Sequence, residues 1–329
     1  MATLPPIGLG LIGVGHHGIR YARHLLQDIS SARLYAVCRQ RPEQGLDLPG
    51  SEAVTVHASP EQLIADPRVE AVIAVVPPVL HKEVCLAAVA ARKPMLIEKP
   101  LAPTYHDACV IVEAAARAGV PVMTAHTLRF DETIRSLRAT VSQIGRTQHV
   151  VLTSRIEIRG RGPGHADGYG KRGALVEFGV HLLDLVRFVT GEEVHTVRCV
   201  LDQLPPDRPE TLALVHLRTT GGVHCSIEVA RVAAGRVGRA EWIGSDGQVT
   251  ADWANRHLRM TGSAGRSEEW QLPQSPTVLT ILQEFVHALR TKTPMPITGE
   301  DGCRAVEIAE ACYRSAEAGG IAVTLPLTR

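Results

Sequence analysis

Apolar runs of strand length alternate with segments of helical periodicity through the first third of the chain. The runs contain almost no polar residues, which is typical of parallel strands covered on both faces. Alternating strands and helices predict a doubly wound parallel sheet that binds its ligands at the carboxyl ends of its strands. We expect these strands at residues 7–12, 33–38, 54–56, 69–76, 95–97 and 120–124.

The pattern changes after Thr124 to longer strand-like runs separated by turn signals. Gly221-Gly222 and Asp246-Gly247 are typical of hairpin turns, so this half is predicted to form a large, mainly antiparallel sheet. Its strands are expected at residues 147–158, 194–201, 211–217 and 223–231, with shorter ones up to about residue 272, and its helices at residues 131–143, 174–189, 278–291 and 300–318.

Length and composition narrow the classes of function. The 329 residues suggest two domains, which we place at residues 1–125 and 126–329. A net charge of +1 favours neither nucleic acid nor a membrane surface as a partner, and no apolar run approaches the roughly 20 residues that span a bilayer. There is no signal-peptide pattern, and the seven cysteines are scattered. We therefore expect a cytoplasmic protein with reduced thiols.

A glycine motif joins the first predicted strand to the first helix. Gly13, Gly15 and Gly18 form G-x-G-x-x-G directly after the apolar run. Gly13 allows a tight turn, Gly15 lets the backbone approach a pyrophosphate, and Gly18 lets the helix pack close to the strand. The N-terminus of the helix presents N–H groups and a positive dipole end to phosphates. This context favours dinucleotide binding over a merely structural turn.

The end of the second predicted strand bears on the choice of cofactor. In a dinucleotide-binding unit an acidic residue there holds the ribose 2′-hydroxyl of NAD. Here the strand runs into Arg39-Gln40-Arg41, and the nearest acid is Glu43. A guanidinium can bind the 2′-phosphate of NADP through paired hydrogen bonds, so we expect NADP to be preferred, with NAD as the alternative cofactor. The competing interpretation is that both arginines are ordinary surface cations.

Glu98-Lys99-Pro100 directly follows the strand predicted at residues 95–97. A lysine at this edge of the sheet can hydrogen-bond a substrate oxygen and, when partly buried, take part in acid–base chemistry. The alternative is a surface lysine held by a turn proline, and position alone does not separate the two.

Glu177, His181 and Asp184 lie on a predicted helix at spacings of four and three, which puts them on one face. Histidine is the natural proton shuttle near pH 7, and a neighbouring carboxylate can orient it. A solvated polar face or a capping network is the alternative. No further His or Cys ligand is evident, so we expect no metal site.

The one long irregular segment, residues 159–173, carries four cations against one acid. Arg159, Arg161, Lys171 and Arg172 are opposed by Asp167. Both a solvated mobile loop and a lid that selects an anionic substrate are consistent with this composition.

Taken together, the motifs resemble the glucose–fructose oxidoreductase/inositol dehydrogenase (Gfo/Idh/MocA) family along essentially the whole chain. The resemblance implies a Rossmann domain followed by an α+β domain with an open-faced sheet, which serves substrate binding and the formation of homodimers or homotetramers. It rests on the glycine motif, VVPPVLHKEV at residues 75–84, Glu98-Lys99-Pro100, Arg129-Phe130, the segment from Gly173 to Asp184, and Gly299-Glu-Asp-Gly302.

The same resemblance implies roles for single residues. Lys99 would be the catalytic lysine, His181 the acid–base residue, and Glu177 a third catalytic group that stands where Asp is usual; Thr127 stands where Asn is common. The cofactor site would comprise Gly13, Gly15, His16, His17, Gly18, Arg39, Gln40, Arg41, Val76, Pro77, His81, Glu98 and Lys99. The substrate site would comprise Lys99, Thr127, Arg129, Tyr169, Arg172, Glu177 and His181.

We therefore predict an NADP(H)-preferring oxidoreductase that transfers hydride to or from a carbinol or carbonyl carbon of a sugar, inositol or sugar derivative. The same chemistry on a non-sugar, such as a cyclic diol or a pyrrole-type compound, is the nearest alternative. A cofactor-binding sensor without turnover is a second alternative, but it would need neither Lys99 nor His181.

Overall fold

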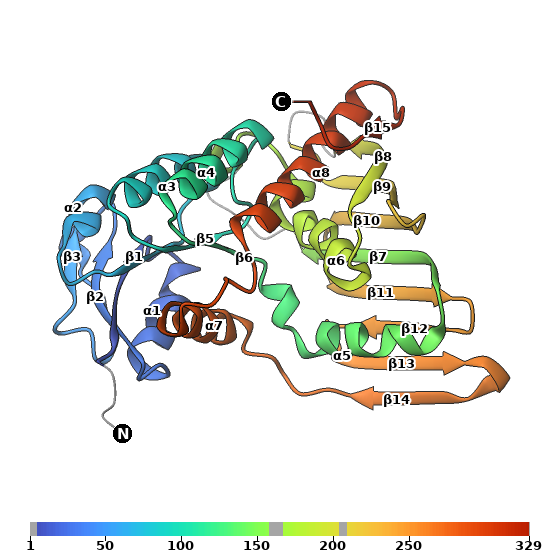
Figure 1. Cartoon of the computed structure of the whole chain (residues 1–329), viewed down its shortest axis with the longest axis horizontal. Coiled ribbons are helices and arrows are strands. Elements are labelled where there is room, and N and C mark those ends of the chain that lie inside the picture. Colours follow the sequence, from blue (N-terminus) through green and yellow to red (C-terminus); the bar gives the residue numbers. More distant parts are fainter. Residues whose placement is uncertain (1–4, 158–166, 204–208, 329) are drawn as a thin grey trace. The chain divides into compact units, whose positions relative to one another are not determined.

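The computed structural model describes residues 5–157, 167–203 and 209–328, which form two compact units (Figure 1). The chain passes from the first unit into the second between residues 127 and 128, two residues after the boundary predicted between residues 125 and 126. The division is not a single cut, however, because residues 276–303 belong with the first unit. Helix α7 (Thr277–Thr291) contacts α1 (Gly18–Gln27) there. The first unit comprises Met1–Ala102, His106–Thr127 and Pro276–Cys303, and the second Pro103–Tyr105, Leu128–Ser275 and Arg304–Arg329.

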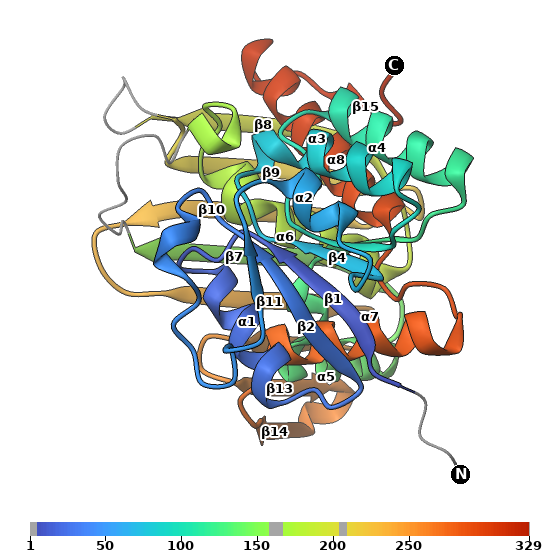
Figure 2. The same cartoon turned by 90° about the vertical axis from the view of Figure 1, so that its left-hand side faces the viewer.

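Six parallel strands form the sheet of the first unit within the described residues, in the order β3-β2-β1-β4-β5-β6. This is the strand order of the Rossmann fold, in which the order reverses between β1 and β4. Strands β2, β1 and β4 lie side by side in Figure 2. The predicted parallel sheet is confirmed. Its strands are β1 (Ile7–Ile12), β2 (Ala32–Cys38), β3 (Thr55–His57), β4 (Ala71–Ala74), β5 (Met95–Glu98) and β6 (Val122–Ala125).

Two helix ends of this half form where the local chemistry predicts: the start of α2 (Pro60–Ala65) and the end of α4 (Tyr105–Ala118). The hydroxyl of Ser59 accepts the N–H of Gln62, as a capping box requires. Gly119, with φ +64°, follows the end of α4 in the left-handed conformation that glycine tolerates best. This half also contains α3 (His81–Ala90), and the division between units falls within α8 (Gly299–Glu317).

A nine-stranded sheet forms the second unit within the described ranges, in the order β14-β13-β12-β11-β7-β10-β9-β8-β15. Every neighbouring pair is antiparallel except β7 and β10, which run parallel. The mainly antiparallel prediction is therefore confirmed with one exception. The strands are β7 (Thr147–Glu157), β8 (Val194–Asp202), β9 (Leu212–Thr219), β10 (His224–Val232), β11 (Val237–Gly244), β12 (Gly247–Asp252), β13 (His257–Gly262), β14 (Ser267–Gln271) and β15 (Val323–Thr324).

The helix predicted at residues 174–189 is not uniform. It begins with a π-helical turn, Leu175–Gly179, and continues as α6 (Val180–Thr190). The predicted helix at residues 131–143 is α5 (Glu132–Thr140), followed by a 3-10 turn. π turns occur mostly as single interruptions of α-helices and often at functional sites.

No helix in the described part of the chain is long and apolar enough to span a bilayer.

A buried ion pair holds α6 within the second unit. Arg129 Nε lies 2.7 Å from Asp184 Oδ2, and Arg129 Nη2 lies 2.5 Å from Oδ1. Both side chains are almost inaccessible to solvent, at 8% and 1% exposure. The guanidinium also lies over the ring of Phe188, 5.0 Å from its centre. Removing either partner would leave an uncompensated charge in the core.

We expect Arg129→Met to lower the free energy of unfolding by about 3–5 kcal/mol, because the carboxylate of Asp184 loses its buried cation. Arg259→Met is the matched control, since the pair it removes with Glu269 is more than half exposed, and it should change stability by less than about 1 kcal/mol. Chemical denaturation measures both. Similar losses in the two variants would contradict the role given to the buried pair.

Candidate functional site

A cavity of about 620 Å³ opens at the carboxyl ends of the central strands of the first unit. Ile12 ends β1, Cys38 ends β2, and Val75 follows β4, so the cavity lies where the strand order reverses. Such a crevice is where doubly wound sheets bind their ligands. The predicted cofactor residues that line it are Gly13, Gly15, Arg39, Gln40, Arg41, Val76 and Pro77.

The three motif glycines differ in what surrounds them. Gly13 has φ +93°, and a Cβ there would lie 2.2 Å from the carbonyl oxygen of Val75. A Cβ on Gly18 would lie 1.9 Å from the carbonyl oxygen of Gly13. A Cβ on Gly15 would meet no heavy atom within 4 Å. Gly13 and Gly18 are thus needed for packing, whereas Gly15 leaves open space beside the backbone, as a pyrophosphate requires.

Glu98 is the centre of a polar cluster that also includes His17, Tyr21 and the backbone of Lys99. Its Oε1 lies 2.7 Å from His17 Nε2 and accepts a 2.5 Å hydrogen bond from the Tyr21 hydroxyl. Its Oε2 accepts the N–H of Lys99 at 3.0 Å. Burial alone would raise the pKa of Glu98, but the hydrogen bond and charge of His17, the charge of Lys99 and the Tyr21 hydroxyl lower it to about 2. Glu98 is therefore ionised and supports the backbone of Lys99.

Tyr21 was not among the predicted site residues. It is fully buried and stands four residues after His17 on α1. The helical spacing could therefore have indicated that Tyr21 lies beside His17.

His16 and His17 are exposed. The direct contacts of His16, His17 and Glu98 with cofactor stay predictions.

His81 was predicted to contact the cofactor, which stays a prediction, and the structure shows a buried position for its side chain. The side chain has no solvent exposure. Nε2 lies 3.0 Å from the carbonyl oxygen of Val76, and Nδ1 lies 3.0 Å from that of Pro100. Burial lowers the pKa of His81. The imidazole therefore links the cavity wall to the loop that carries Lys99.

In the second unit, Glu177 and Asp184 have partners from distant parts of the sequence. Glu177 forms an ion pair with Arg231, and both side chains are nearly buried. Asp184 is paired with Arg129. The predicted placement of Glu177, His181 and Asp184 on one face stays a prediction, and the structure adds an arginine partner for each of the two carboxylates. His181 is half-buried at the start of α6.

The segment before the π turn is fastened to α8 and to Glu210. Arg172 Nη2 donates to Glu310 at 2.6 Å, and its guanidinium lies over the Tyr313 ring at 4.5 Å. Glu210 accepts the N–H of Gly173 at 2.8 Å and the Tyr313 hydroxyl at 2.6 Å. Residues 159–166 of the predicted loop, with Arg159 and Arg161, lie outside the described residues. Substrate contacts from Thr127, Arg129, Tyr169 and Arg172 stay predictions.

All seven cysteines are described and buried, and none of them forms a disulfide. Across the described ranges no three His, Cys, Asp or Glu side chains are placed to hold a metal ion.

The chain matches two models of known protein families. Residues 7–126 match the model described as an oxidoreductase family with an NAD-binding Rossmann fold, and residues 117–250 match the GFO/IDH/MocA C-terminal domain. The two matches overlap and together cover most of the chain.

Known proteins are similar over most of their length. Inositol 2-dehydrogenase 2 of Saccharopolyspora erythraea is 28% identical, with 96% of this chain and 95% of that protein covered. The inositol 2-dehydrogenase of Acidothermus cellulolyticus is 32% identical over 76% of this chain and 74% of its own. The crystal structure of an Agrobacterium radiobacter oxidoreductase in complex with NAD+, L-tartaric acid and magnesium has a TM-score of 0.83 at 21% identity, with 97% and 98% of the chains covered. That likeness shows the fold.

We expect Gly15→Ala to weaken NAD binding at least about tenfold, roughly 1.4 kcal/mol, without loss of stability, because the new methyl group occupies space open to a pyrophosphate. Gly262→Ala is the control, since its Cβ would meet its nearest heavy atom only at 4.0 Å and it lies in the second unit. Calorimetric titration with NAD and thermal unfolding give the two quantities. Unchanged affinity in Gly15→Ala would refute the role given to this glycine.

Proposed function

The chain belongs to the Gfo/Idh/MocA family of oxidoreductases, and from this premise we propose that it is an NAD(P)-dependent dehydrogenase of inositol or a related sugar or polyol. The observation that carries the proposal is the place of Lys99, at the carboxyl end of β5 and backed by the ionised Glu98. The similarity to inositol 2-dehydrogenases supports the substrate class. A cytoplasmic location is part of the proposal.

The residues of this chain would divide the work of oxidation. NAD(P), when bound, supplies the hydride acceptor. The His181 imidazole accepts the proton of the substrate hydroxyl, and the Lys99 ammonium donates a hydrogen bond to the oxygen as it gains negative charge. Glu98 holds the Lys99 backbone. In reduction the same groups return the proton.

We expect Lys99→Met and His181→Ala each to lower kcat at least about 100-fold, as loss of a general acid–base group does, while NAD(P) affinity is kept. Lys82→Met is the control, because Lys82 is paired with Asp107 at the surface. Cofactor absorbance with myo-inositol, sugars, sugar acids, cyclic diols and pyrrole-type compounds measures turnover. Near wild-type kcat in either variant would refute that residue's role; cofactor binding without turnover of any substrate would favour a sensor.

We also propose that NADP(H) is the preferred cofactor. Arg39 and Arg41 line the cavity at the end of β2, where NAD-specific units carry an acid. Arg39 Nη1 donates to the carbonyl oxygen of Gly45 at 2.6 Å, and Nη2 donates to Gln44. These bonds hold the guanidinium in the cavity wall and leave N–H donors for a phosphate.

Arg39→Asp is expected to remove the preference for NADP, mainly by weakening NADP binding, because a carboxylate repels the 2′-phosphate. Arg33→Asp makes the same change of charge at the other end of β2 and should leave the ratio of affinities unchanged. Dissociation constants of NAD and NADP are measured for all three proteins. Tighter binding of NAD by the wild type would overturn the preference and leave the dehydrogenase proposal in place.

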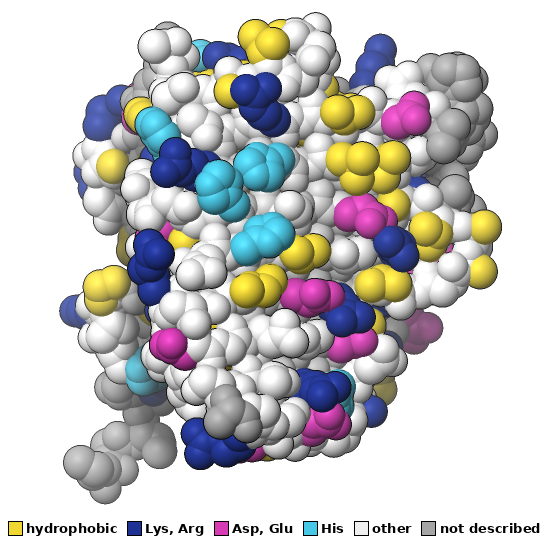
Figure 3. All heavy atoms as spheres, turned by 90° about the vertical axis from the view of Figure 1, so that its right-hand side faces the viewer, with side chains coloured by type: hydrophobic (Ala, Val, Ile, Leu, Met, Phe, Trp, Pro, Cys, Tyr) yellow, Lys and Arg dark blue, Asp and Glu magenta, His cyan; other side chains and the backbone are white. Residues whose placement is uncertain are grey.

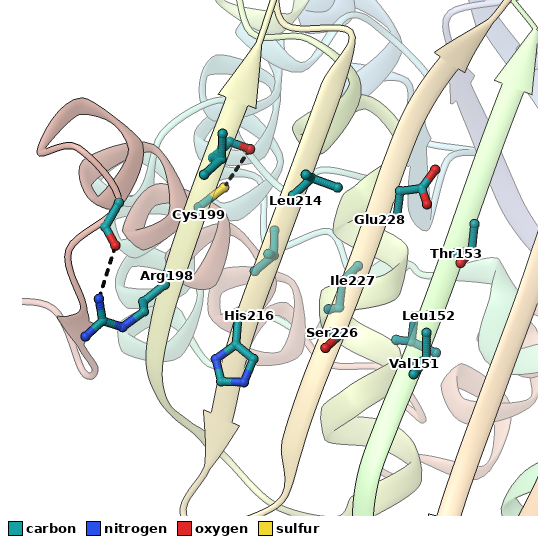
Figure 4. Close-up of a pocket in the computed structure, with 13 residues that line it drawn as sticks. Val151, Leu152, Thr153, Arg198, Cys199, Leu214, His216, Ser226, Ile227 and Glu228 are labelled. Carbon is teal, nitrogen blue, oxygen red and sulfur yellow. Dashed lines mark hydrogen bonds between the residues drawn. The ribbon is translucent and has the colours of Figure 1, made fainter.

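The open face of the nine-stranded sheet is the proposed interface of a homodimer or homotetramer. Histidine side chains gather on a face of the molecule (Figure 3), and the ring centres of His216 and His224 lie 5.4 Å apart. A cavity of about 420 Å³ lies on this sheet, and Leu214, His216 and Ser226 line it (Figure 4). Leu214 and Val200 are 46% and 58% exposed. Val200 and Leu214 are directly paired across β8 and β9, and contiguous exposed apolar side chains favour an interaction surface.

We expect Leu214→Glu to lower the assembly mass in sedimentation experiments, because burying a new carboxylate in an apolar interface is costly. Val79→Glu is the control, since Val79 is equally exposed, at 45%, but lies in the first unit. An unchanged mass in Leu214→Glu, or a monomeric wild type, would exclude this face as the interface.

A further inference from the structure

The π turn that precedes His181 is held at its start by a buried carboxylate. Glu210, 5% exposed, accepts the N–H of Gly173 at 2.8 Å and that of Leu175 at 3.2 Å. The carbonyl oxygen of Glu210 accepts the N–H of Ala174 at 2.9 Å. The adjoining Thr211 carbonyl oxygen accepts the N–H of Arg231 at 2.7 Å. One short segment therefore binds both the start of the π turn and the end of β10.

The middle and end of the π turn contact β10 directly. Arg231, on β10, forms the ion pair with Glu177 and lies over the ring of Phe178, 4.8 Å from its centre. A Cβ on Gly179 would lie 2.9 Å from Val229 Cγ2. Arg231 thus touches two consecutive residues of the turn and is nearly buried, with 10% exposure.

We propose that Arg231 is a positioning residue for His181: its ion pair with Glu177 fastens the π turn to β10 and so fixes the start of α6. The inference rests on the proposed function, in which His181 moves the proton. His181 follows the π turn after one residue, so a shift of the turn changes the direction of the imidazole. A displacement of about 1 Å at a reacting group can cost 100-fold in rate.

A second ion pair between neighbouring segments gives a matched control. Arg155 Nε and Nη2 lie 2.6 and 2.9 Å from the carboxylate of Glu228, so this pair joins β7 and β10. Its side chains are 44% and 30% exposed, and neither residue belongs to the π turn. Arg155→Met therefore removes an Arg–Glu pair from the same sheet without touching the turn.

Arg231→Met is expected to lower kcat at least about tenfold with KM for NAD(P) unchanged, and Arg231→Lys to restore part of the loss, because a cation is kept. Arg155→Met should leave kcat near the wild-type value. In a double-mutant cycle, Arg231→Met should add little to Glu177→Gln if Arg231 acts through Glu177. Additive losses, or wild-type kcat in Arg231→Met, would overturn the proposal.

A readout without turnover separates this inference from the proposed function. The NMR titration of the His181 ring, assigned with His181→Gln, should change its midpoint or chemical shifts in Arg231→Met but not in Arg155→Met. Should the wild type oxidise none of the substrates tested, the proposed function fails while this comparison still decides the positioning role. Identical His181 spectra in the wild type and Arg231→Met, with both proteins folded by circular dichroism, would refute it.

Discussion

A buried carboxylate must be paired with a cation or accept several hydrogen bonds. This requirement determines how the proposed functional residues of both units are held. Glu98 meets His17, Tyr21 and the backbone of Lys99. In the second unit Asp184 meets Arg129 and Glu177 meets Arg231. Each carboxylate lies beside, or within one helical turn of, a residue assigned to chemistry. The buried charges thus hold in place the groups that are proposed to react.

In the first unit, the residues that support the cofactor cavity differ from the residues that line it. Gly13 and Gly18 cannot carry a side chain because the backbone comes too close, and His81 is sealed from solvent between two carbonyl groups. The cavity is instead lined by open backbone at Gly15 and by the arginines after β2. A surface that binds a dinucleotide needs both, since free N–H groups and open space recognise phosphates only when the scaffold below is rigid.

In the second unit, an irregular helical turn is held in place by contacts with distant parts of the chain. A π turn stands where the sequence pattern predicts continuous α-helix, and it is fixed by Glu210, Arg231 and close packing on Val229. The opposite face of the same sheet carries exposed apolar side chains and histidines, which suits contact with another chain.

The sequence by itself determined the parallel sheet, the mainly antiparallel sheet and the glycine motif. These depend on local periodicity, turn chemistry and the conformational freedom of glycine, which operate over a few residues. The family followed from the resemblance of several motifs along the chain. Only the tertiary structure decided the partners of the buried charges: Glu98 accepts a hydrogen bond from Tyr21, 77 residues away, and Arg231 on β10 pairs with Glu177 in the π turn. An alternation of inward positions along β10, Cys225, Ile227, Val229 and Arg231, hints at a buried cation. The identity of its partner follows from packing, because the pairing of distant elements, rather than the local pattern, determines which side chains share a site.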